Sequence, residues 1–167
     1  MNFSNLKYLL STVIDSCESD QVDVAFLVDV SSSICQGSSS LDRDGECQAF
    51  KQQEAFIESL MRDILDSGST TGMISWSTRV NELYEFNQYF GVDENVAALH
   101  EHLIHAQGAT MTGAMIDSYL NFLAEDQAVR HESGRKQVVV LITDGVSTDL
   151  ACQNAETFRE LTQGIRF

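Results

Sequence analysis

Two strand-like runs, each followed closely by an aspartate, constrain the fold of this chain most. Residues 22–28 read Val-Asp-Val-Ala-Phe-Leu-Val, a β-branched and aromatic sequence suited to a strand that is buried on both faces. Residues 138–142 read Val-Val-Val-Leu-Ile, the most apolar run in the chain, and Thr143-Asp144-Gly145 follows them. Strands of this kind belong to parallel sheets covered by helices, so we expect an α/β fold.

Helical and strand-like patterns alternate between and after these two runs. Apolar residues recur at helical spacing in several segments, and the predicted helices cover residues 48–65, 94–105, 113–124 and 149–162. Residues 71–77 and 82–86 predict two short strands that pair antiparallel across a turn. This order predicts a doubly wound, mostly parallel sheet with helices on both faces.

Length and charge limit the number of domains and the kinds of partner. The chain has 167 residues, 43% of them hydrophobic, which is enough for one domain, and we place that domain at 22–167 after an N-terminal extension at 1–21. The 25 acidic residues against 10 basic ones give a formal charge of -15, which repels phosphate backbones and anionic lipids. We therefore expect neither nucleic acid nor membrane insertion.

Oxygen-bearing side chains cluster where the two runs end. Asp29-Val30-Ser31-Ser32-Ser33 offers a carboxylate and hydroxyls at alternate positions, and Asp144 follows the second run. Mg²⁺ prefers oxygen ligands in a near-octahedral shell and uses one or two carboxylates. Because ligands of open parallel sheets bind outside the carboxyl ends of the strands, Asp29 and Asp144 would converge if their strands are neighbours.

These segments, together with Thr110 in Gly-Ala-Thr-Met-Thr-Gly, resemble the metal-ion-dependent adhesion site of von Willebrand factor type A domains, and the strands look most like the A domains of matrilins and collagen type VI. The resemblance implies a metal site made by Asp29, Ser31, Ser33, Thr110 and Asp144. The hydroxyls would approach Mg²⁺, with Mn²⁺ or Ca²⁺ as alternatives, and the carboxylates would act directly or through water. Thr110 is preferred because the family usually uses the first Thr of Thr-x-Thr, although spacing leaves Thr112 open.

The same resemblance implies a function. The free metal position would take a Glu or Asp of a protein ligand, so the chain is expected to be a non-enzymatic, extracellular adhesion or matrix-binding module. An intracellular assembly module of the same fold is the main alternative, and a metal-assisted hydrolase is a minor one. The sequence has no phosphate loop with Lys and no His-Glu-x-x-His motif, which weighs against an enzyme.

Cysteines and histidines give weaker signals. Cys35 and Cys47 bracket a polar loop that a disulfide could close, and this spacing favours an oxidising compartment. No signal peptide is evident, since the apolar stretch at 8–14 is short for one. Three histidines fall in the predicted helix 94–105, and they are His100, His102 and His105. The last two are three residues apart, so a soft-metal site competes with a solvated helix face.

The end of the chain departs from the family pattern. The family's sheet has six strands, whereas this chain ends at Gly164-Ile165-Arg166-Phe167, where a fifth strand would begin. We therefore expect a domain that lacks its C-terminal strands and belongs to a longer protein. In such a chain, residues 138–142 would form an edge of the sheet.

Overall fold

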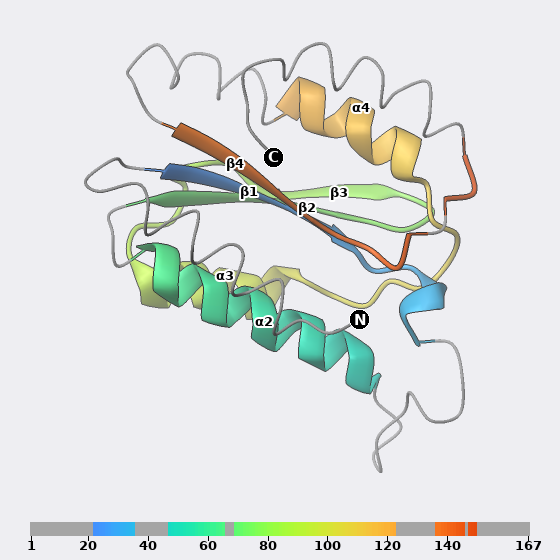
Figure 1. The fold of residues 1–167 in the computed structure, drawn as a ribbon, viewed down its shortest axis with the longest axis horizontal. Coiled ribbons are helices and arrows are strands. Elements are labelled where there is room, and N and C mark those ends of the chain that lie inside the picture. The colour runs from blue at the N-terminus through green and yellow to red at the C-terminus, as the bar shows by residue number, and fades with distance from the viewer. Residues whose placement is uncertain (1–21, 36–46, 66–68, 123–135, 146, 150–167) are drawn as a thin grey trace.

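A four-stranded sheet with helices on both faces forms the centre of the molecule (Figure 1). The computed structural model describes residues 22–35, 47–65, 69–122, 136–145 and 147–149. The predicted extension at 1–21, all of the predicted helix 149–162 except its first residue, and the place of a fifth strand lie outside these residues. The α/β class and the helices on both faces are confirmed.

The strands follow the order β3-β2-β1-β4. They are β1 at Val22–Asp29, β2 at Thr70–Trp76, β3 at Val80–Tyr84 and β4 at Lys136–Ile142. Strand β1 pairs in parallel with both β2 and β4, whereas β2 and β3 are antiparallel, as predicted. Both short strands begin and end earlier than expected, because the turn that joins them lies at 77–79, where the Ser77 N–H donates to the Arg79 carbonyl over 2.9 Å.

Strand β1 is buried along its whole length, which explains its composition. Its side chains alternate between two hydrophobic clusters, with Phe26 and Val28 in one and Ala25 and Leu27 in the other. The polar Asp23 is accommodated because the Thr70 hydroxyl donates to its carboxylate over 2.7 Å. A strand covered on both faces needs apolar residues at nearly every position, so the sequence shows no polar alternation.

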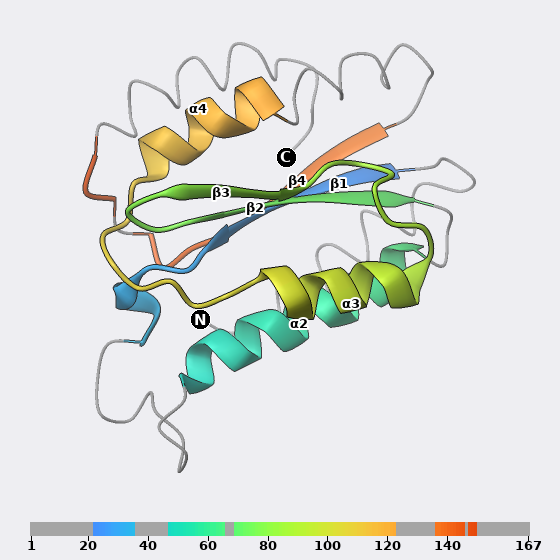
Figure 2. The ribbon, with the colours of Figure 1, turned by 180° about the vertical axis from the view of Figure 1, so that it is seen from behind.

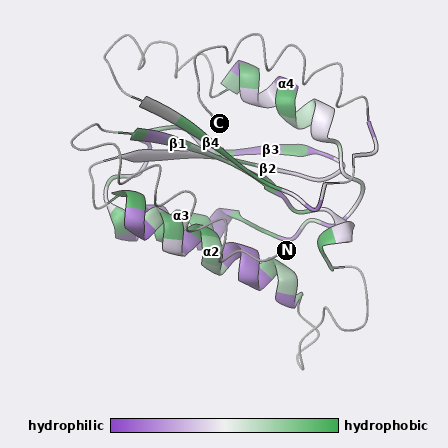
Figure 3. Ribbon diagram, in the orientation of Figure 1, coloured by the Kyte–Doolittle hydropathy of each residue, from purple (hydrophilic) through white to green (hydrophobic). Residues whose placement is uncertain are grey.

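The helices divide between the two faces of the sheet. Figure 2 shows α2 (Gln48–Leu65) and α3 (Val92–His102) on one face and α4 (Thr112–Phe122) on the other. Hydrophilic and hydrophobic residues alternate around α2 (Figure 3), and its buried side faces the larger cluster. None of the helices in the described residues has the length and apolar character that a membrane span requires.

Helix α3 ends three residues earlier than predicted. It stops at His102, because Leu103 takes an extended conformation and is buried, so that Ile104 and His105 lie in the loop that follows. The prediction that His102 and His105 share one helical face is therefore wrong. The Tyr89 hydroxyl lies 3.0 Å from His102 Nε2, while His105 packs elsewhere.

Candidate metal centre

The candidate centre lies where β1 and β4 end. These strands are parallel neighbours, and Val28 is opposite Ile142 in the register, so their carboxyl ends reach the same edge of the sheet. Asp29 is the last residue of β1, and Asp144 comes two residues after β4. The loop between α3 and α4, which carries Thr110, passes the same edge (Figure 1). The strands that carry Asp29 and Asp144 are therefore neighbours, which is the condition under which the sequence predicts that the two residues converge.

Three hydroxyls lie together at this edge. The Thr110 hydroxyl donates to Ser31 Oγ over 2.9 Å, and the hydroxyl oxygens of Ser31 and Ser33 are also 2.9 Å apart. Ser31 and Thr110 are buried, whereas Ser33 is partly exposed. In an octahedral shell with Mg–O distances of about 2.1 Å, adjacent ligand oxygens are about 3.0 Å apart. The separations from Ser31 to Thr110 and from Ser31 to Ser33 are therefore close to that of adjacent ligand oxygens around Mg²⁺.

Asp29 is fully buried, and both of its carboxylate oxygens have donors. Oδ1 accepts the backbone N–H of Ser31 over 2.9 Å, and Oδ2 accepts the hydroxyl of Thr143 over 2.8 Å. These bonds fix the orientation of the carboxylate and tie the end of β4 to the end of β1. Thr143 is a residue that sequence reasoning did not assign, although it stands beside Asp144 in the quoted motif.

Asp144 is the exposed acid of the site. It follows Thr143 directly, and the Gly145 N–H donates to the Thr143 hydroxyl over 3.1 Å, which tightens the turn around Asp144. A buried Asp29 and an exposed Asp144 give the site one carboxylate that is held by the fold and one that faces solvent.

Hydrogen bonds join the segment after β1 to the loop between α3 and α4 beside the hydroxyls. The Ser32 N–H donates to the Gly108 carbonyl over 3.0 Å, and the Gly108 N–H donates to Ser32 Oγ over 2.7 Å. The Ser32 hydroxyl thus holds the loop in place, whereas the hydroxyls of Ser31 and Ser33 belong to the candidate site. Gly108 has a φ of 96°, and a Cβ there would collide with the side chain of Thr78, so glycine is required.

The position of Thr110 is fixed through its carbonyl. The backbone N–H and the hydroxyl of Thr148 both donate to that carbonyl, over 2.8 and 2.9 Å. Thr112 is instead the first residue of α4. Of the two threonines, Thr110 has its hydroxyl bonded to Ser31.

Gln53 is a second residue that sequence reasoning missed. It is buried on α2, and its side-chain amide donates to the Asp29 carbonyl over 2.9 Å. A polar residue on the apolar face of a predicted helix is the signal that could have revealed it, because a buried amide needs a partner.

Asp149 is a third missed residue, and it caps α4. Its carboxylate accepts the N–H groups of Gly113 and Ala114 over 2.8 and 3.0 Å and the Ser147 hydroxyl over 2.7 Å. Partial burial raises its pKa, but these three donors outweigh burial and hold the pKa below the usual 3.8. The cap anchors the segment after β4 to the start of α4, and α4 begins two residues after Thr110.

Asp149→Ala is expected to lower the free energy of unfolding by about 1 kcal/mol, because two N–H groups of α4 lose their acceptor. Asp149→Asn keeps one acceptor oxygen, so its free energy of unfolding should lie between those of Asp149→Ala and the wild type. Since the folded-state pKa is depressed, the stabilisation is present above the unfolded pKa and disappears as the pH falls through the folded value. Urea unfolding at pH 7 and pH 3 checks this, and an equal deficit at both pH values would contradict it.

Cys35 and Cys47 form a disulfide in the structure. The bond joins the short 3-10 helix η1 (Ser32–Cys35) to the residue before α2, with a sequence separation of 12. It therefore ties Ser33, two residues away, to the first turn of a helix that packs on the sheet.

Known proteins are similar to this chain in sequence and in fold. The family model of the von Willebrand factor type A domain matches residues 23–166. The human collagen alpha-5(VI) chain is 28% identical over 156 residues, and the transmembrane cell adhesion receptor mua-3 of Caenorhabditis elegans is 28% identical over 153 residues. These matches cover 89% and 90% of this chain but only 5% and 4% of the relatives, so the chain spans a small part of their length.

Solved structures show the same fold. Proximal thread matrix protein 1 from the mussel byssus, in a structure described as having a zinc-occupied MIDAS motif, has a TM-score of 0.61 and 21% identity. The similarity covers 95% of this chain and 39% of that protein. With the family model covering most of the sequence and the fold agreeing, this chain belongs to the von Willebrand factor type A domain family.

Proposed function

We propose that this domain is an extracellular adhesion or matrix-binding module that holds a divalent cation, Mg²⁺ by preference, through Asp29, Ser31, Ser33, Thr110 and Asp144, and binds an acidic residue of a protein partner there. The observation that carries the proposal is the hydroxyl cluster, in which Thr110, Ser31 and Ser33 are linked by contacts of 2.9 Å. Hydroxyls and carboxylates without sulfur or imidazole are the donor set that hard cations prefer.

The role of each residue follows from its surroundings. Ser31 and Thr110 are buried and bonded to each other, so their oxygens are held in place before a cation arrives. Asp29, with both oxygens occupied by donors, is suited to act through a bound water, whereas the exposed Asp144 is suited to direct or water-mediated contact. A bound dication would supply a Lewis-acidic centre for a partner's carboxylate oxygen.

The biological setting is argued from the relatives. Chains of collagen VI and a transmembrane cell adhesion receptor contain domains like this one, which supports a role in the extracellular matrix or in adhesion. The Cys35–Cys47 disulfide supports an oxidising compartment, because cytosolic thiols are kept reduced. Both points favour the extracellular module over the intracellular assembly module.

Calorimetric titration of Mg²⁺ and Mn²⁺ tests the metal site. We expect saturable one-site binding, and Thr110→Val should weaken it about tenfold, because one hydroxyl ligand is replaced by a methyl group of similar size. Thr112→Val is the matched control, since it removes the other threonine hydroxyl of the same motif and should bind as the wild type does. Absence of binding by the folded wild type, or a loss confined to Thr112→Val, would overturn the assignment.

The partner is tested by capture of the domain on an immobilised extract of extracellular matrix. Capture should require Mg²⁺ and be lost in excess chelator or with Asp144→Ala. Equal capture with and without chelator would contradict binding through the cation.

A further inference from the structure

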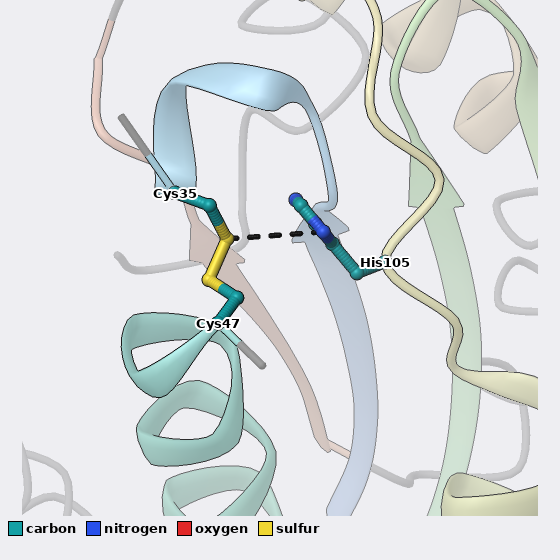
Figure 4. Close-up of side chains that lie close together, drawn as sticks. All are labelled: Cys35, Cys47 and His105. Atoms are coloured by element: carbon teal, nitrogen blue, oxygen red, sulfur yellow. Dashed lines mark hydrogen bonds between the residues drawn. A yellow bond between two sulfur atoms is a disulfide. The ribbon is translucent and has the colours of Figure 1, made fainter. Parts of the chain in front are cut away.

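A second group of metal-ligating side chains lies beside the oxygen site. It consists of Cys35, Cys47 and His105, shown in Figure 4, whose ligand atoms all lie within 4.8 Å of one another. The three residues come from η1, the residue before α2 and the loop after α3. All three are partly exposed, so small molecules and ions can reach them.

The hydrogen bonds of His105 decide which of its nitrogens faces the cysteines. Nε2 lies 3.2 Å from the carbonyl oxygen of Ser31, and because a carbonyl only accepts, Nε2 carries the proton. In the neutral ring Nδ1 then carries a lone pair and no proton, and it lies 3.8 Å from Cys35 Sγ. A disulfide sulfur has no hydrogen, so this contact can be a hydrogen bond in this tautomer only when Cys35 is a thiol. The Phe50 ring packs on the imidazole with centroids 5.4 Å apart and holds its orientation. Histidine ligands of metals commonly donate their second N–H to a backbone carbonyl in this way.

Cys47 is placed to act as a thiolate. It directly precedes the 18-residue helix α2, and the Phe50 N–H donates to its sulfur over 3.3 Å. A helix N-terminus and an N–H donor both favour a negative charge on sulfur. With the disulfide intact, however, neither sulfur can serve as a thiolate.

We propose that reduction of the Cys35–Cys47 disulfide opens a binding site for a soft divalent cation such as Zn²⁺, with the two thiolates and His105 Nδ1 as ligands. The reductant is a dithiol. One of its thiolates attacks a disulfide sulfur, its second thiol displaces the mixed disulfide, and two electrons and two protons pass to the protein while the reagent becomes a cyclic disulfide. On metal binding the two thiol protons pass to the buffer.

The distances suit a tetrahedral ion. With Zn–S of about 2.3 Å and Zn–N of about 2.05 Å, nitrogen and sulfur ligands of one tetrahedral ion are about 3.6 Å apart, and two sulfurs about 3.8 Å apart. The distance from Nδ1 to Cys35 Sγ, 3.8 Å, is already close to this value. Two adjustments remain once the disulfide is broken: the sulfurs must move apart, and Cys47 Sγ, which lies within 4.8 Å of Nδ1, must come to the same distance from it as Cys35 Sγ.

The proposed thiolate and histidine site differs from the oxygen site in the metals that it selects. Thiolate and imidazole ligands favour Zn²⁺, whereas hydroxyl and carboxylate ligands favour Mg²⁺. Three protein ligands leave a fourth position for water or another ligand. The two sites are adjacent, because His105 donates to the carbonyl of Ser31, whose hydroxyl belongs to the oxygen site.

Cobalt spectroscopy of the full chain tests the proposal. Co²⁺ replaces Zn²⁺ and gives a thiolate-to-metal charge-transfer band only when sulfur is a ligand, so binding at the oxygen site is silent. The protein would carry Cys17→Ser and Cys152→Ser, because these cysteines lie outside the described residues and would otherwise compete. With excess Mg²⁺ present, we expect one equivalent of Co²⁺ to give the band in protein that has been reduced with the dithiol and then freed of it without air, and no band in oxidised protein.

Variants distinguish the three-ligand site from chance binding to thiols. Cys35→Ser should abolish the band, and His105→Gln should weaken Co²⁺ binding at least tenfold and change the tetrahedral d–d spectrum. His102→Gln is the matched control and should leave both unchanged. The proposal is overturned if reduced protein gives no band, if His105→Gln behaves like the wild type, or if reduction unfolds the domain and Zn²⁺ does not restore its circular dichroism.

Discussion

Replacing Asp144 by alanine is expected to weaken Mg²⁺ binding at least 100-fold while leaving the fold intact. In the proposed site two carboxylates, Asp29 and Asp144, would balance the charge of the dication, and the hydroxyls are neutral. A unit charge about 4 Å from another contributes about 4 kcal/mol in a partly shielded site, and a 100-fold loss corresponds to about 2.7 kcal/mol. Because Asp144 is exposed, its truncation leaves no cavity in the core.

Asp117→Ala is the matched control for this experiment. Asp117 is an exposed carboxylate on α4, so its removal changes the net charge equally without touching the site. Calorimetric titration should show wild-type affinity for this variant, and circular dichroism should show all three proteins folded. Comparable affinities for Asp144→Ala and Asp117→Ala would mean that general negative charge, and not the assigned ligand, attracts the ion.

Phe26→Ala is expected to lower the free energy of unfolding by about 3–5 kcal/mol. Phe26 is fully buried at the middle of β1, which pairs with two strands and carries Asp29 at its end. Removal of the ring costs the transfer energy of its atoms and leaves a cavity that a central strand cannot close. Since a domain of this size is stable by only about 5–15 kcal/mol, the variant should be close to unfolding.

Phe90→Ala provides the comparison for the same chemical change at the surface. The side chain of Phe90 is 71% exposed, so its loss should change stability by no more than about 0.5 kcal/mol. Urea unfolding followed by circular dichroism measures both variants. Equal stabilities would show that Phe26 does not pack in the way the structure indicates.

The local pattern of the sequence predicted most of the secondary structure. Helix α2 begins and ends where predicted, at Gln48 and Leu65, because a long amphipathic stretch followed by Asp-Ser-Gly marks both its face and its end. The short strands β2 and β3 were found with shifted bounds, since the turn at 77–79 has no strong sequence signal. Helix α3 was predicted too long because Leu103, which is buried in an extended conformation, also fits a helical spacing.

The candidate site could be predicted only in part. Asp29, Ser31 and Ser33 lie close in sequence, so their common position at the end of β1 is local information. The missed residues act through distant contacts, and no local pattern records such contacts. The sequence separation is 114 for Thr143, 24 for Gln53 and 36 for Asp149. Their signals, a hydroxyl beside an aspartate and an amide on an apolar helix face, are too common to stand out.

By itself, the sequence determined that this chain forms an α/β domain with oxygen donors at strand ends, because hydrophobic periodicity and strand termini are local properties of a chain. Only the tertiary structure decided which donors meet. The hydroxyl of Thr110 reaches Ser31 across 79 residues, and His105 reaches the disulfide of Cys35 across 70. Such meetings depend on how strands pair and where helices end, and these are settled by packing of the whole domain.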